Sequence, residues 1–179
     1  MTDPVIDITL RTCLALLIAS AAWHKLSDRL RFAETLRAYE LLPRWLVSPA
    51  ASLLALLELS IAAGLLYPPS RELAALAAIS LLSLYTGAIA TNLLRGRQQI
   101  DCGCFASSRS APLSSLLIVR NLILLSAAAV LLMPVQSRTL LWVDLFSVAA
   151  AVLTLSLLWA AAQHLAASGP ALQSSKGPL

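Results

Sequence analysis

The sequence predicts an all-α integral membrane protein: a bundle of four to five transmembrane helices, with an amphipathic helix at the interface after the first. Of its 179 residues, 59% are hydrophobic and 12% are charged, whereas soluble domains carry about 25% charged residues. Its mean hydropathy is +0.80. Runs of about 20 apolar residues, enough to cross a bilayer, follow one another along the chain. Residues 1–167 are therefore expected to form one membrane domain, and the Gly/Pro/Ser-rich residues 168–179 a disordered tail.

The apolar runs place the spans in order along the chain. They are expected at about residues 8–26, 45–67, 73–94, 113–133 and 139–165. The first run has neither a basic segment before it nor a small-residue cleavage pattern after it, so we expect no cleaved signal peptide.

The connection between the first two spans has a helical pattern of its own. Apolar and charged residues alternate at nearly helical spacing, which is typical of a helix lying in the membrane interface. Ser27 or Asp28 can cap its N-terminus, and Pro43 is expected to end it.

Glu58 lies well inside the second span. An ionisable side chain there costs about 2.5 to 3.5 kcal/mol on insertion scales, so Glu58 should face the bundle interior and be paired or neutral. A protonated, hydrogen-bonded carboxyl and a proton-handling role fit this position equally. We expect Arg120 of the fourth span to be its cation, because Lys25 and Arg95 lie nearer the interface. Asp101 is an alternative partner for Arg120.

The segment after the third span is chemically distinctive. Cys102 and Cys104 are separated only by Gly103, which has no Cβ to obstruct the approach of the two thiols. This favours redox chemistry over zinc binding, because a structural zinc site needs four ligands and only His24 and His164 could be added. The alternative is two unlinked, half-buried thiols. A third cysteine, in the first span near the opposite membrane face, is expected to be inert: Cys13.

The basic residues indicate an orientation. With five spans, ten of the 13 lie on the side of the cysteine segment: Lys25, Arg29, Arg31, Arg37, Arg44, Arg95, Arg97, Arg109, Arg120 and Lys176. The positive-inside rule makes that side cytoplasmic and puts the N-terminus outside, although stable disulfides belong outside the cytoplasm. Lys25, Arg95 and Arg120 could instead converge on the cysteines and stabilise a thiolate. We expect no nucleic-acid binding, because no basic, aromatic-interleaved patch occurs.

Several short motifs give the chain a resemblance. They are Lys25-Leu26, Tyr39-Glu40-Leu41-Leu42-Pro43, Leu57-Glu58-Leu59, Arg95-Gly96, Asp101-Cys102-Gly103-Cys104-Phe105, Pro112-Leu113-Ser114 and Arg120-Asn121. Together they resemble the MauE family of DoxX-like membrane proteins. One departure is Ala106, where many relatives have glycine. The resemblance implies a bacterial inner-membrane protein that helps to mature the small, disulfide-rich subunit of methylamine dehydrogenase with a periplasmic thioredoxin-like partner.

Two functions remain open at this point. In the first, Cys102 and Cys104 cycle between dithiol and disulfide, and an electron acceptor such as a quinone is needed; the resemblance names no cofactor. In the second, the protein is a non-enzymatic assembly factor or an anchor for the thioredoxin-like partner, and the cysteines are structural. A substrate transporter is a weaker third reading, because no paired repeats are visible.

Overall fold

The computed structural model describes residues 1–96 and 115–174, and nearly all of this chain is helical. Its helices are α1 (Pro4–Ser27), α2 (Arg29–Ala38), α3 (Arg44–Leu66), η1 (a 3-10 turn, Pro68–Ser70), α4 (Arg71–Leu94), α5 (Ser115–Val130) and α6 (Trp142–Ser174). Four helical stretches are long and apolar enough to cross a membrane: Pro4–Ser27, Arg44–Leu66, Pro68–Leu94 and Trp142–Ala162. The shorter α5 has 16 residues. This confirms the predicted membrane bundle with a short helix after the first span.

Local capping explains where the first two helices begin. Asp3 accepts a hydrogen bond from the backbone N–H of Val5 at 2.8 Å, and Pro4 occupies the first turn, so α1 begins before the expected residue 8. Asp28 caps α2 in the same way, through the N–H of Arg31 at 3.1 Å, as the sequence predicted.

The end of α2 corrects one expectation. The helix ends at Ala38 rather than at Pro43, because Glu40 adopts a left-handed backbone conformation with φ of 49° and turns the chain out of the helix. Pro43 instead precedes the first turn of α3, where its fixed φ suits a helix start. The chain therefore needs only a short connection between the two helices.

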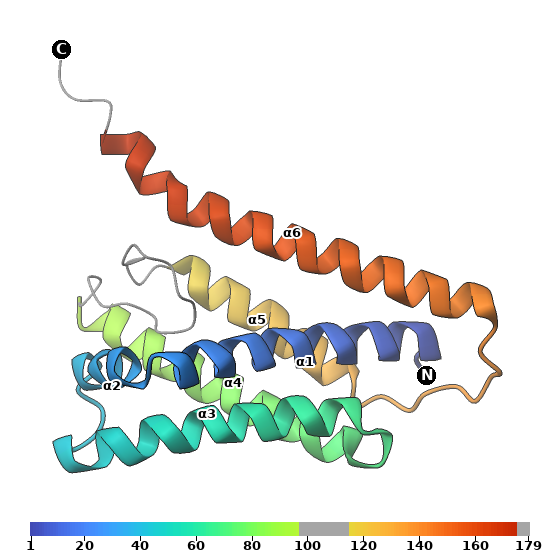
Figure 1. Ribbon diagram of the computed structural model, residues 1–179, viewed down its shortest axis with the longest axis horizontal. Helices are drawn as coiled ribbons and strands as arrows, with labels where there is room; N and C mark the ends of the chain where they lie inside the picture. The colour runs from blue at the N-terminus through green and yellow to red at the C-terminus, as the bar shows by residue number, and fades with distance from the viewer. Residues whose placement is uncertain (97–114, 175–179) are drawn as a thin grey trace.

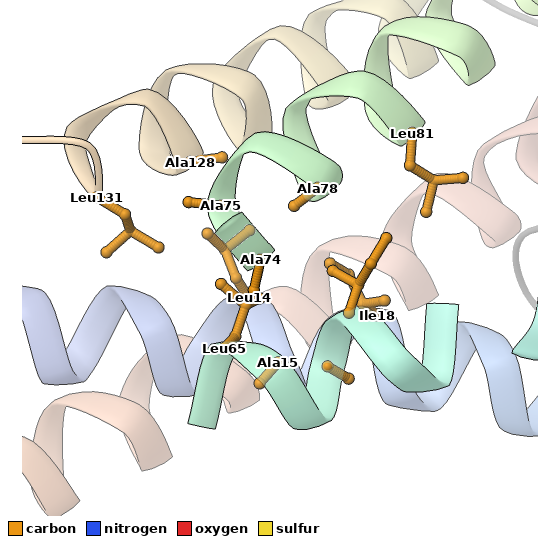
Figure 2. Close-up of a cluster of buried hydrophobic side chains, with 12 residues drawn as sticks. Leu14, Ala15, Ile18, Leu65, Ala74, Ala75, Ala78, Leu81, Ala128 and Leu131 are labelled. Carbon is orange, nitrogen blue, oxygen red and sulfur yellow. The ribbon is translucent and has the colours of Figure 1, made fainter. Parts of the chain in front are cut away.

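The centre of the bundle is packed from small side chains. α1 packs against α3, α4 lies between α3 and α5, and the buried side chains of these four helices point toward one another (Figures 1 and 2). Ala74, Ala75 and Ala78 form much of this core. Small residues let helix backbones approach closely in a membrane, where packing rather than water exclusion drives association.

Helix α6 lies at the periphery. It packs against α1 near the N-terminus of α1 and diverges from the bundle toward its own C-terminus (Figure 1). Val148 is buried, but most of the other described side chains of its span-forming window are exposed to the outside of the bundle. The helix continues past Ser168, where the sequence led us to expect a disordered tail, to Ser174; residues 175–179 lie outside the described part.

Ion pairs and backbone contacts fasten the end of the bundle where α1 begins. Arg71 pairs with the buried Asp7 at 2.9 Å, and Arg138 bridges Asp3 and Asp144 at 3.0 and 2.7 Å. The N–H of Thr2 also donates to the carbonyl of Pro134 at 3.0 Å. The hydrogen bonds from Arg138 lower the pKa of the Asp3 carboxyl. The N-terminus is thereby tied to the α5–α6 connection.

Gly64 and Gly87 provide a test of the helix packing. A Cβ built at Gly64 would lie 3.1 Å from the Cβ of Ala74, whereas one at Gly87 meets nothing within 4 Å. Gly64→Leu should therefore destabilise the bundle by about 1 to 3 kcal/mol through overpacking between α3 and α4. Gly87→Leu gains the same helix propensity without the clash and should be neutral or stabilising. Unfolding in detergent, followed by circular dichroism, measures both; equal stabilities would contradict the packing described.

Candidate functional site

Three helices bring together a polar cluster inside the bundle, which we call the Lys25–Glu58–Tyr85 cluster. Lys25 and Glu58 are 3% and 2% exposed, and the Nζ of Lys25 forms an ion pair with Oε1 of Glu58. Lys25 Nζ also donates to the Tyr85 hydroxyl at 3.0 Å, and that hydroxyl donates to the same Oε1 at 2.7 Å. Glu58 therefore faces the interior, as its cost in a membrane predicted.

The cation that pairs with Glu58 corrects a prediction. We expected Arg120, because Lys25 seemed to lie near the interface; the structure places Lys25 beside Glu58 instead. Glu58 is about 21 Å along the axis from the start of α3 at Arg44. Lys25 reaches this depth because α1 ends within the bundle, at Ser27, and α2 occupies the space beyond it (Figure 1).

Helix α2 covers the end of α1 by packing on α3. Phe32 and Ala33 are buried against Val47 and Ala51, while Arg31 and Glu34 on the opposite side of the helix are exposed. The Phe32 ring centroid lies 5.0 Å from Lys25 Nζ, and the Tyr85 ring centroid lies 4.6 Å from it. Two aromatic rings thus add cation–π stabilisation to the ammonium group.

One oxygen of the cluster has no partner. Oε1 of Glu58 accepts both hydrogen bonds, whereas Oε2 is buried and has no donor among the described residues. A buried carboxylate oxygen without a donor is costly. This oxygen is therefore a position at which a proton or a water molecule would be stabilised.

A cavity of about 60 Å³ adjoins the cluster. It lies between α2 and the C-terminal part of α4, and Lys25 and Tyr85 line it as well as forming the cluster. The remaining lining is mostly apolar and includes Phe32, Tyr39 and Ile89. Two of the three members of the cluster thus help to line a small, mostly apolar space whose volume suffices for water.

The same end of the bundle carries the helix ends that flank the cysteine segment. Tyr39, just after α2, is buried against Ile89 near the end of α4, and Leu117 near the start of α5 packs against this pair. The segment that contains Cys102 and Cys104 joins these two helices. The described ends of α4 and α5 therefore lie next to the cavity.

Two other predicted site residues, Arg95 and Arg120, are described by the structure and lie apart from the cluster. Arg95 is exposed at the C-terminus of α4, and Arg120 lies with its guanidinium carbon 5.9 Å from the ring centroid of Trp159 on α6. Neither forms an ion pair with Glu58. Asp101, Cys102 and Cys104 lie outside the described residues, so the predicted convergence of cations on the thiols stays a prediction.

Sequence reasoning missed Tyr85 as a site residue. It noted only a polar member of the third span, although a tyrosine hydroxyl in mid-membrane needs a hydrogen-bonding partner. Tyr85 lies about 14 Å from the end of α4, well inside the span-forming part of that helix. That depth was the signal that could have found it.

A double-mutant cycle tests the ion pair. Lys25→Met should lower the free energy of unfolding by about 3 to 5 kcal/mol, because it leaves a charged carboxylate buried without its cation. Lys25→Met combined with Glu58→Gln should recover much of this loss, because no unpaired charge remains. Arg95→Met is the matched control, with an expected change of about 0.5 kcal/mol or less at an exposed position. Additive effects of the two core substitutions, measured by unfolding in detergent, would contradict the pairing.

The part of the chain that is similar to known proteins includes the whole of this site. The family model described as "Methylamine utilisation protein MauE" matches residues 3–134, a range that contains the cluster, the cavity and the cysteine segment. The methylamine utilization protein MauE of Methylorubrum extorquens is 40% identical over 181 aligned positions, covering 99% of this chain and 97% of that relative. The protein of that name from Paracoccus denitrificans is 40% identical over 128 residues, 72% of this chain and 69% of the relative. No solved structure matches the chain. The chain belongs to the MauE family of methylamine utilisation proteins.

Proposed function

We propose that this protein matures the small, disulfide-rich subunit of methylamine dehydrogenase by thiol–disulfide exchange at Cys102 and Cys104. Membership of the MauE family supports the pathway. The observation that carries the chemical part is the buried Lys25–Glu58–Tyr85 cluster with its adjoining cavity. The cavity lies beside the helix ends from which the cysteine segment departs. A periplasmic thioredoxin-like protein is the proposed partner.

The chemistry of exchange gives the cluster a role. A thiolate attacks the disulfide, so each cysteine must lose its proton before it reacts. In the proposed cycle, the Cys102–Cys104 disulfide oxidises two thiols of the partner; the partner's disulfide forms and the pair returns to the dithiol. Oε2 of Glu58, which has no hydrogen-bond donor among the described residues, is a site that could hold a proton in transit while a thiol is deprotonated for attack. Ionisable groups kept inside a membrane commonly mark such a role.

We propose that the protein lies in the bacterial inner membrane. The charge count favours the cysteine end toward the cytoplasm, whereas direct exchange with a periplasmic partner requires that end to face the periplasm. In addition, Arg71 and Arg138 at the opposite end are each ion-paired with acidic residues, so they contribute little net positive charge there. With the cysteines on the cytoplasmic side, electrons would have to cross the membrane to connect them with a periplasmic subunit.

A second candidate function is a non-enzymatic assembly factor or anchor. The observation that favours it is α6, whose span-forming window is mostly exposed and which diverges from the bundle (Figure 1). Such a helix is available for contact with another membrane chain. In that reading the cysteines are structural and take no part in exchange.

Replacing each cysteine separates the two functions. Cys102→Ser and Cys104→Ser should each reduce maturation of the dehydrogenase subunit to the level of a deletion strain, because exchange needs both thiols of the pair. Cys13→Ser is the matched control and should change nothing, because Cys13 lies within α1, away from this end. The readouts are the disulfide state of the subunit, its dehydrogenase activity and the amount of membrane protein. Normal maturation with either serine variant would favour the assembly factor.

Reporter fusions test the orientation. A reporter fused after Leu179 should be active only as a cytoplasmic reporter, and one fused before Met1 only as a periplasmic one, because basic connections remain inside. Substituting Arg29, Arg31 and Arg37 with Gln should weaken this preference. An external C-terminus in the unmodified chain would overturn the proposed orientation and would place the cysteine end in direct contact with the periplasm.

A further inference from the structure

Helix α6 contacts the bundle at two separate places. Near its start it packs against α1, and α1 is the only helix in the described part of the chain that its backbone approaches closely. Farther along, the ring centroid of Trp159 lies 5.9 Å from the guanidinium carbon of Arg120 on α5. Between these contacts α6 diverges from the bundle (Figure 1). The side chains that α6 and α5 carry on their facing sides therefore determine what can lie between them.

The bundle-facing side of α6 is uncovered between the two contacts. The residues that share this face recur at spacings of four, three and four: Val148, Val152, Leu155 and Trp159. Val148 is buried, whereas Leu155 is 46% exposed although it lies on the same face. Trp159, one turn later, is half-buried again. The apolar surface around Leu155 is thus left open, and the contact of Trp159 with Arg120 bounds it at one end.

Helix α5 has an exposed apolar surface beside the same contact. Leu116 lies four residues before Arg120 and Ile123 lies three residues after it, so all three share one face of α5. Leu116 and Ile123 are 70% and 60% exposed. The guanidinium group of Arg120 is therefore set among apolar side chains that an acyl chain would cover.

The contact between Arg120 and Trp159 offers hydrogen-bond donors to an anion. The indole N–H of Trp159 is enclosed and has no acceptor among the described residues, which is costly. A guanidinium carries five N–H donors in a planar fork, so Arg120 can bind a phosphate in addition to another group. The only acidic residue in α5 and in Trp142–Ala162 is Asp144, which pairs with Arg138 near the start of α6. The site therefore suits an anion with several acceptor oxygens.

The depth of the contact matches that of lipid headgroups. Trp142 at the start of α6 is 88% exposed, and such tryptophans are enriched at the membrane–water interface. Trp159 lies about 25 Å farther along the helix axis, whereas the hydrocarbon core is about 30 Å thick. Trp159 and Arg120 are therefore near the opposite interface, where a long basic side chain reaches lipid phosphates.

We propose that a phospholipid lies between the diverging parts of α5 and α6, with its phosphate at Arg120 and Trp159. The guanidinium binds the phosphate oxygens, and the half-buried indole turns to donate its N–H to one of them. The acyl chains run toward the membrane centre and cover Leu155 of α6 and Ile123 of α5. Because the described side chains at this contact carry one positive charge and no negative one, an anionic phospholipid binds more tightly than a zwitterionic one.

Fluorescence quenching in the full chain tests the site. Trp23, Trp45 and Trp142 are 71%, 76% and 88% exposed, so their replacement by Phe leaves Trp159 as the single indole with little effect on packing. This chain is placed in phosphatidylcholine nanodiscs with brominated phosphatidylglycerol or brominated phosphatidylcholine as the quencher. Trp159 should reach half-maximal quenching at an about fivefold lower mole fraction of the anionic quencher. A chain that keeps only Trp142 should show no such preference, because the nearby Arg138 is ion-paired with acidic residues.

Substitutions at Arg120 assign the lipid preference to this site. Arg120→Gln should abolish the preference, whereas Arg120→Lys keeps the charge and should retain part of it. Arg95→Gln is the matched control, since Arg95 is an exposed basic residue at the same end and its loss should leave the preference unchanged. An undiminished preference in Arg120→Gln would overturn the inference. So would equal quenching by the two lipids in the chain with Trp159 alone, a comparison that needs no change at Arg120 and therefore holds even if Arg120→Gln fails to fold.

Discussion

The ion pair between Lys25 and Glu58 is the contact on which the arrangement of this bundle depends. Either group alone would be costly at this depth in a membrane, whereas the pair is neutral as a whole and hydrogen-bonded to Tyr85. The pair fixes the position of α1 against α3, and Tyr85 adds α4 to the same contact. Because Lys25 must reach Glu58, α1 ends within the bundle, and the chain needs α2 to return to the interface.

The cavity follows from that geometry. Helix α2 packs on α3 through Phe32 and Ala33 and leaves a small, mostly apolar space toward α4 that Lys25 and Tyr85 help to line. The centre of the bundle is closely packed instead, because alanines bring the backbones of α1, α3, α4 and α5 close together (Figure 2). Polar chemistry is therefore concentrated where α1 stops, while the alanine-rich half serves as a rigid support.

Much of the fold could be predicted from sequence because composition and periodicity report directly on membrane spans and on an amphipathic helix. The burial of Glu58 followed from the energetic cost of its charge alone. The identity of the cation that pairs with Glu58 did not follow, because depth was judged along each helix separately. That treatment assumes that the end of α1 and the start of α3 lie at the same membrane level. A sequence gives the distance of Lys25 from the end of its own helix but not the tertiary offset between helices. The wrong choice of Arg120 arose there. The role of the cysteine pair stays a prediction.

Because α1 ends deeper in the bundle than the level at which α3 begins, Lys25 enters the membrane before its partner exists. Glu58 follows Lys25 by 33 residues, which at about 5 to 20 residues per second corresponds to a few seconds of synthesis. During that interval the ammonium group has no carboxylate beside it, so α1 must keep Lys25 near lipid headgroups or within the insertion machinery. Only when α3 arrives can α1 move to its final depth. Insertion of the first helix is therefore completed by the second span, and the two enter the bilayer as an antiparallel unit.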